Sequence, residues 1–180
     1  ITNLPVVLLN THADFDHIAG NDAFSTAYMH PSEYVNYFAG GQKHPKPTAI
    51  WDKQIIDLGN REIEVISIPG HTPGSVALLD KKYRVLISGD SIQDGRIYMF
   101  GVFRNMIAYK HSLLKIVKYI DEFDYVYAAH GTFNLPSTII YDLLKAVEQI
   151  EKQEVDYEEI IVDNQVVKQY SFDVAKFLLD

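Results

Sequence analysis

Four side chains that can bind a metal ion lie close together near the start of the chain, directly after the apolar run 6–9. They are His12, Asp14, Asp16 and His17. Imidazole and carboxylate groups suit zinc, iron and manganese, and two carboxylates in so short a loop repel one another unless a cation neutralises them. The same residue types also cap helices and hydrogen-bond turns. The loop therefore predicts either half of a metal site or a well-bonded turn.

Three later segments favour the metal site, because each ends a predicted strand with one more ligand-type residue. A β-branched strand leads into a Gly- and Pro-rich turn with His71 at its apex, a buried-type strand leads to Asp90, and another leads to His130. In layered α/β folds the strands end at a common edge of the sheet, which is the usual place for an active site. We therefore expect these residues to meet the first group at one edge.

The elements that position these residues alternate between strands and helices. Period-two patterns and apolar runs predict strands over residues 5–10, 27–30, 53–58, 61–68, 75–80 and 83–88. Helices are predicted over residues 16–26 and 32–38, the second capped by Ser32, and over two amphipathic stretches near 113–120 and 140–147. Residues 39–47 are predicted to form a loop, and residues 158–162 and 165–171 a hairpin. Mixed strands with helices on the outside favour an α/β sandwich of two sheets.

The order of the motifs resembles that of the metallo-β-lactamase superfamily, in which His-x-His-x-Asp-His is followed by a separate His, an Asp and a His. The resemblance runs from His12 to His130 and implies an αββα sandwich, two mixed sheets flanked by helices, in a single domain over residues 1–180. It also implies two metal ions bridged by Asp90. The first ion would be held by His12, Asp14 and His71, and the second by Asp16, His17 and His130. Asp16 would also orient the attacking hydroxide and is the candidate catalytic residue.

The chain departs from the family pattern at two places. Asp14 stands where the family most often has a His, so the resting site would carry less positive charge, and we expect a higher pKa for its bound water. The motif also begins already at His12, whereas family members usually have a hairpin-rich segment and a helix before it. We therefore expect N-terminal strands of one sheet to be missing, with the chain being a fragment or another chain covering the open sheet edge.

Composition excludes several classes of function. The 180 residues include no cysteine, which rules out disulfides and thiolate ligands and is compatible with a cytoplasmic location. The net charge of −8 gives no general attraction to nucleic acid or to anionic membranes, and no apolar stretch approaches the length of a membrane span. We expect a cytoplasmic protein that binds neither nucleic acid nor membrane.

The segment that follows Asp90 is rich in aromatic residues and arginine, as loops that contact a substrate often are. Either a pocket for a small acyl substrate or simple packing of the loop explains its candidate residues Tyr98, Phe100, Phe103 and Arg104. The remaining histidines are predicted to be structural or solvent-facing. They are His30, His44 and His111.

These observations predict a dinuclear metal-dependent hydrolase that uses a metal-bridging hydroxide on a small ester, thioester or lactone, in the manner of the glyoxalase II-like branch that the resemblance implies. Two divalent ions are expected, zinc first, with iron or manganese as alternatives. A carboxylate at position 14 also fits a flavodiiron-type oxygen or nitric oxide reductase-like domain, and a non-catalytic metal-binding module is a third interpretation. The expected partners are a small-molecule acyl substrate and a second copy or another chain over the sheet edge.

Overall fold

The computed structural model describes residues 4–39 and 44–180, whose strands form sheets of six, four and two strands. The largest sheet has the order β3-β4-β5-β6-β8-β9. Its strands are β3 (Ile55–Asp57), β4 (Glu62–Ser67), β5 (Val76–Asp80), β6 (Val85–Gly89), β8 (Tyr125–Ala128) and β9 (Asn134–Pro136). β4, β6 and β8 run in one direction, because β5 is antiparallel to both β4 and β6, and β8 is parallel to β6. The carboxyl ends of these three strands therefore lie at the same edge.

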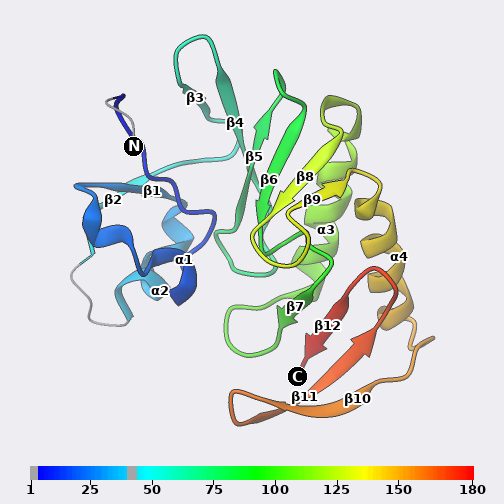
Figure 1. Ribbon diagram of the computed structural model, residues 1–180. Coiled ribbons are helices and arrows are strands. Elements are labelled where there is room, and N and C mark those ends of the chain that lie inside the picture. The colour runs from blue at the N-terminus through cyan, green and yellow to red at the C-terminus, as the bar shows by residue number, and fades with distance from the viewer. Residues whose placement is uncertain (1–3, 40–43) are drawn as a thin grey trace.

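The four-stranded sheet joins the end of the chain to its middle, in the order β10-β11-β12-β7 (Figure 1). Its strands are β7 (Arg96–Met99), β10 (Glu158–Val162), β11 (Gln165–Ser171) and β12 (Lys176–Leu179). β10 and β11 form the predicted hairpin, and β12 pairs in parallel with β7. The last strands are thereby held next to the segment that follows Asp90.

The two-stranded sheet lies beside the segment that leads into the first motif. It consists of β1 (Ala27–Met29) and β2 (Pro47–Ala49), which run parallel to each other. Leu9 bridges to Tyr28 in the same direction, and the backbone N–H of Asn10 donates to the carbonyl of Tyr28 at 2.9 Å. The residues that lead into the motif therefore run beside β1.

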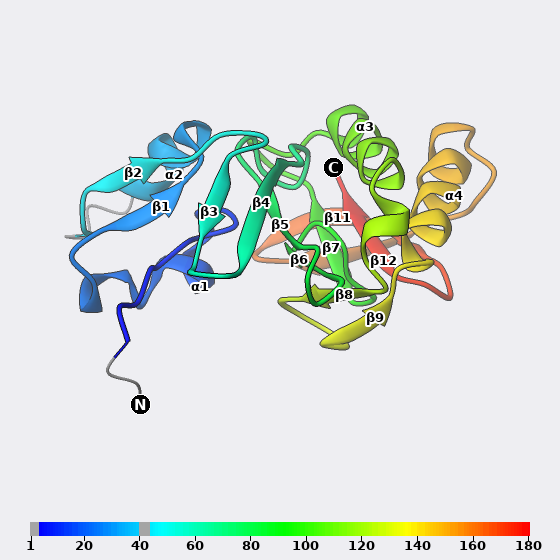
Figure 2. The same cartoon turned by 90° about the horizontal axis from the view of Figure 1, so that it is seen from above.

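Helices and small elements cover both faces of the six-stranded sheet (Figure 2). α3 (Met106–Val117) and α4 (Ile139–Glu151) lie on one side, and β1 and β2 with α1 (Phe15–Ile18) and α2 (Tyr34–Ala39) lie on the other. Side chains alternate between the two cores as strand geometry requires: Ile66 packs with α3 and α4, whereas its neighbour Val65 packs with Ile50. Short 3₁₀ helices span Asn21–Ala23, Pro31–Glu33 and Ile120–Glu122. The predicted mixed sheets flanked by helices are confirmed.

Two local predictions near the first motif were wrong. The helix expected over 16–26 is only the single turn α1 and a 3₁₀ turn, because glycine at position 20 favours helix poorly and the buried Asn21 side chain bonds instead to Oδ1 of Asn10 at 2.8 Å. The cap expected from Ser32 comes from His30, whose Nδ1 accepts a hydrogen bond from the N–H of Ser32 at 3.3 Å.

Other differences concern short strands. The segment after Asp90 contains β7, and neither β9 nor β12 was predicted, because strands of three or four residues show too little periodicity. The strand expected over 5–10 pairs only through the bridge at Leu9. Of the loop expected over 39–47, residues 40–43 lie outside the described residues, and β2 begins at Pro47. None of the helices in the described ranges has the length and apolar character needed to cross a membrane.

Candidate metal centre

The seven predicted metal ligands meet at the edge where β4, β6 and β8 end. His71 follows β4, Asp90 follows β6 and His130 follows β8, while the first motif enters from the run beside β1. Gly89 allows the end of β6 to lie close to Thr11, next to the first motif. Its φ is +56°, and a Cβ there would lie 2.5 Å from Oγ1 of Thr11. Strand direction and one glycine thus bring together ligands that are far apart in the sequence.

The first group of ligands is buried. Oδ2 of Asp14 lies 3.6 Å from Nε2 of His12 and 3.3 Å from Nε2 of His71. Both imidazoles are only 1% exposed, and Asp14 is placed at the N-cap of α1 without capping it. The carboxylate therefore faces the two imidazoles and is not used to cap the helix.

The second group faces solvent. Oδ2 of Asp16 lies 3.0 Å from Nε2 of His130 and 3.5 Å from Nε2 of His17. The side chains of Asp16 and His130 are 55% and 50% exposed. The site is therefore open to solvent on the side of this second group.

Asp90 lies between the two groups. Its Oδ1 is 3.0 Å from Nε2 of His17, and its Oδ2 is 3.4 Å from Nε2 of His130. The same Oδ2 lies 3.7 Å from Nε2 of His71 and 3.9 Å from Nε2 of His12. One carboxylate thus contacts both groups, which is the geometry that a bridging ligand needs.

The donor atoms fit a divalent metal. The buried Nε2 atoms of His12, His17 and His71 form no hydrogen bond within the part of the chain that the structure describes. Nδ1 of His71 lies 3.0 Å from the carbonyl oxygen of Tyr98. Because a carbonyl only accepts, this contact assigns the ring proton to Nδ1 and leaves the lone pair of Nε2 directed into the cluster. Imidazole and carboxylate ligands without thiolate suit zinc, iron and manganese.

Electrostatics hold His12, Asp14 and Asp90 in the forms that bind metal, whereas contact with Asp90 raises the pKa of His17 against the effect of burial. Burial lowers the pKa of His12 below its ordinary value, so its imidazole is neutral at pH 7. Burial alone would raise the pKa of Asp14, but contacts with His12 and His71 and the charge of Arg104 outweigh it and hold that pKa well below the usual range. Against the effect of burial, the close contact with His17, whose Nε2 lies 3.0 Å from Oδ1, lowers the pKa of Asp90. Neutral imidazole and ionised carboxylate are the states that ligate.

Arg104, a predicted substrate contact, lines the cavity over the site and also contacts a ligand candidate. Its Nη2 donates to Oδ2 of Asp14 at 2.6 Å, and its Nη1 donates to the carbonyl of His71. Predicted as a substrate contact, Arg104 thus lies against a ligand candidate. The positive φ of Gly101 and Phe103 turns the loop so that this is possible.

The cavity over the site has a volume of about 560 Å³. Of the residues predicted to contact substrate, Tyr98 and Arg104 line it, whereas Phe100 packs against the ring of Tyr98 and Phe103 lines a smaller neighbouring hollow. Besides two glycines, sequence reasoning missed three residues that line the cavity, Gln93, Arg96 and Asp163. Asp163 comes from the turn between β10 and β11, and only the hairpin pattern hinted that this turn exists.

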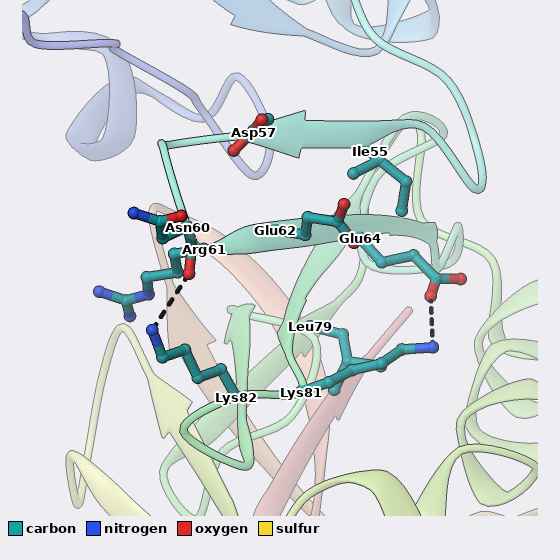
Figure 3. A pocket seen from close by; sticks show the side chains of 9 residues that line it. All are labelled: Ile55, Asp57, Asn60, Arg61, Glu62, Glu64, Leu79, Lys81 and Lys82. Atoms are coloured by element: carbon teal, nitrogen blue, oxygen red, sulfur yellow. Dashed lines mark hydrogen bonds and ion pairs between the residues drawn. The ribbon is translucent and has the colours of Figure 1, made fainter.

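A second hollow of similar size lies over β3, β4 and β5, away from the ligand candidates (Figure 3). Both lysines in its lining have a partner: Lys81 lies 3.0 Å from Glu64, and Lys82 donates to the carbonyl of Asn60 at 3.1 Å. None of the ligand candidates lines this hollow.

The remaining histidines lie outside the cluster. His30 caps a 3₁₀ helix, His44 stacks on Tyr37 with ring centroids 4.8 Å apart, and His111 is exposed on α3. Their surroundings match the structural or solvent-facing places predicted for them.

Comparisons with known proteins agree with this geometry. The chain is 24% identical over 159 residues to acyl-coenzyme A thioesterase MBLAC2 of Gallus gallus, and the alignment covers 73% of this chain and 57% of that protein. It is 27% identical over 157 residues to hydroxyacylglutathione hydrolase of Gloeobacter violaceus, with 83% and 60% covered. The chain therefore spans a little over half the length of these curated relatives.

Solved structures and a family model also relate this chain to metallo-beta-lactamases. The metallo-beta-lactamase from Pontibacter korlensis superposes with a TM-score of 0.69 at 16% identity, covering 80% of this chain and 70% of that chain, which shows a shared fold. The model of the metallo-beta-lactamase superfamily matches residues 5–157, a range that includes every ligand candidate. The chain therefore belongs to the metallo-beta-lactamase superfamily.

Proposed function

We propose that this protein is a dinuclear metal-dependent hydrolase that cleaves a small thioester, ester or lactone. The observation that carries the proposal is the pair of His and Asp groups joined by Asp90, with buried ring nitrogens directed at carboxylates. His12, Asp14 and His71 would hold one divalent ion, and Asp16, His17 and His130 the other, with zinc favoured over iron and manganese.

Bound ions at such a site supply a water whose pKa falls from 15.7 toward about 7 and polarise the carbonyl under attack. Asp16 is the residue placed to move protons. Its carboxylate is half exposed at the mouth of the site and lies 3.0 Å from Nε2 of His130. It can orient the attacking water, accept its proton, and return that proton to the sulfur or oxygen that leaves. The products are a carboxylic acid and a thiol or alcohol, so atoms and charge balance.

The relatives and the cavity support acyl substrates. An acyl-coenzyme A thioesterase and a hydroxyacylglutathione hydrolase both act on thioesters, and both thiols carry anionic groups. Arg96 lines the cavity at the start of β7, and its exposed guanidinium forms no hydrogen bond or ion pair with any described residue. We assign it to an anionic group of the substrate. We also propose that the protein is cytoplasmic and that a second copy or another chain covers the sheet edge.

The proposal is tested by elemental analysis of protein prepared without chelator, followed by a substrate panel. We expect two ions per chain and the highest kcat/KM on an acyl-coenzyme A or a hydroxyacylglutathione, with a phosphodiester and a β-lactam far slower. Fewer than one ion per chain, with metal in excess, would overturn the dinuclear site. The highest kcat/KM on the phosphodiester would overturn the substrate class and leave the metal site standing.

Asp14 favours one other function, a diiron reductase, because carboxylate is a harder ligand than imidazole. The elemental analysis separates the two. Iron as the dominant metal, together with oxygen consumption when an electron donor is supplied and no thioesterase activity, would replace the hydrolase with the reductase.

A further inference from the structure

Glu33 is a buried carboxylate that touches two of the loops carrying ligand candidates. Its side chain is 1% exposed and ends between the loop of His12 and the turn after His71. Oε2 accepts a hydrogen bond from the N–H of Ala13 at 2.7 Å, and Oε1 accepts one from the N–H of Gly74 at 2.7 Å. One side chain therefore ties the backbones of two segments that are distant in the sequence.

Asn36 also bonds to the loop of His12. Its Nδ2 donates to the carbonyl of Ala13 at 2.9 Å and to Oδ1 of Asp14 at 3.3 Å. Glu33 belongs to the 3₁₀ helix that runs into α2, and Asn36 belongs to α2. We call these two residues the clamp. Because both come from one helical segment, the clamp connects that segment to the loops that carry His12, Asp14 and His71.

The contact with Gly74 is close enough to depend on glycine. A Cβ at this position would lie 2.8 Å from Cγ of Glu33 and 2.9 Å from its Oε1. A buried carboxylate is costly unless it is hydrogen-bonded, and hydrogen bonds from N–H groups to an ionised acceptor are stronger than neutral ones. The carboxylate is thus retained in the core by its bonds to the two loops.

We propose that the clamp sets the position of His12 and Asp14 relative to His71, and thereby determines the affinity of the first group for its ion. Glu33 and Asn36 act through the backbone and through Asp14, so they are positioning residues. The clamp makes no contact with Asp16, His17 or His130 among the described interactions, and the second group should bind as before. This inference rests on the proposed metal centre.

The test is a stepwise titration of metal-free protein with Zn²⁺ against a chromophoric chelator, repeated with Co²⁺ to read the ligand field of each ion. Glu33→Gln is compared with wild type. The matched control is Asp80→Asn, because Asp80 is also 1% exposed and also accepts two hydrogen bonds, from the N–H of Tyr83 and Nε of Arg61. Circular dichroism and thermal melting report folding of each variant.

We expect Glu33→Gln to lower the affinity for one of the two ions by about 10- to 100-fold and to change one Co²⁺ absorption band. Asp80→Asn should lower the melting temperature while leaving both affinities within about threefold of wild type. If folded Glu33→Gln bound both ions with wild-type affinity, the proposed role of the clamp would be overturned while the proposed metal centre would stand. Wild-type protein that binds no metal would overturn the proposed function and the clamp together.

Asn36→Ala keeps the inference testable if Glu33→Gln does not fold. It removes the bonds to Ala13 and Asp14 from a half-buried position and leaves Glu33 in place. We expect the same ion to be weakened, by a smaller factor, because the bond to Gly74 remains. Unchanged affinity for both ions in this variant would also overturn the clamp.

Discussion

Arg104 donates a hydrogen bond to Oδ2 of Asp14 at 2.6 Å, and the same oxygen lies 3.3 Å from Nε2 of His71. The sequence alone indicates less positive charge at the site because of Asp14, but it does not show that this guanidinium lies beside it. Asp14 removes one positive unit relative to a His at the same position, and Arg104 returns one unit beside it. The higher pKa of bound water expected from Asp14 alone therefore does not follow. Asp14 and Arg104 form one electrostatic unit.

A double-mutant cycle tests that unit. We expect Asp14→His alone to weaken zinc binding, because it leaves a guanidinium facing imidazoles and a cation. Adding Arg104→Met should recover much of the loss, with a coupling of about 0.5–3 kcal/mol. Zinc affinities of the four proteins are measured by chelator competition. Additive effects would show that the two residues act independently.

Arg104→Lys separates charge from geometry. Lysine keeps the positive charge but cannot bond to the Asp14 carboxylate and to the carbonyl of His71 with the same fixed fork. We expect the zinc affinity of Arg104→Lys to lie between the affinity of wild type and that of Arg104→Met. Affinity equal to wild type would mean that only the charge matters.

His130 gives a prediction about turnover. His130→Ala removes a ligand candidate that is half exposed, so it should lower kcat/KM on thioesters by at least about a hundredfold while leaving the melting temperature nearly unchanged. His111→Ala, at an exposed position on α3, is the matched control and should retain wild-type rates. Comparable activity in the two variants would remove His130 from the site.

Arg96 gives a prediction about substrate recognition. We expect Arg96→Gln to raise KM for acyl-coenzyme A or hydroxyacylglutathione about tenfold or more, since a charge-assisted hydrogen bond is worth about 1.5–3 kcal/mol. Values of kcat, and KM for a small uncharged ester, should stay close to wild type. Equal losses on charged and uncharged substrates would show that Arg96 shapes the cavity instead of binding an anion.

The metal-free protein should lose stability in acid. The pKa of Asp14 and of Asp90 is lower in the folded chain than the ordinary value of 3.8. The unfolded chain therefore binds more protons below about pH 4, so the stabilisation present above that pH is lost as the pH falls. Chemical denaturation at pH 5 and pH 3 measures it. Asp14→Asn should show a smaller loss than wild type, whereas Asp156→Asn, at an exposed position, should behave like wild type.

The proximity of the ligand candidates could be predicted from the sequence, because His71, Asp90 and His130 each follow a strand and the strands run in one direction. Their roles as ligands stay predictions. The contacts of Arg104 and Glu33 could not be predicted. The contact of Arg104 depends on the path of a loop that turns at positive φ, and the contacts of Glu33 depend on a short 3₁₀ helix that has no sequence periodicity. Both sets of contacts join residues that are distant in the sequence. Local patterns carry no information about such pairs.

The turn that brings Asp163 to the cavity lies beyond residue 157, where the match to the family ends, whereas every ligand candidate lies before it. The hairpin therefore adds Asp163 to the lining of a cavity whose other lining residues, including Arg96, lie within the family match. Substitutions at Asp163 should change the cavity while leaving the candidate metal ligands in place. For protein engineering, this turn is a small library target outside the segments that carry the ligand candidates.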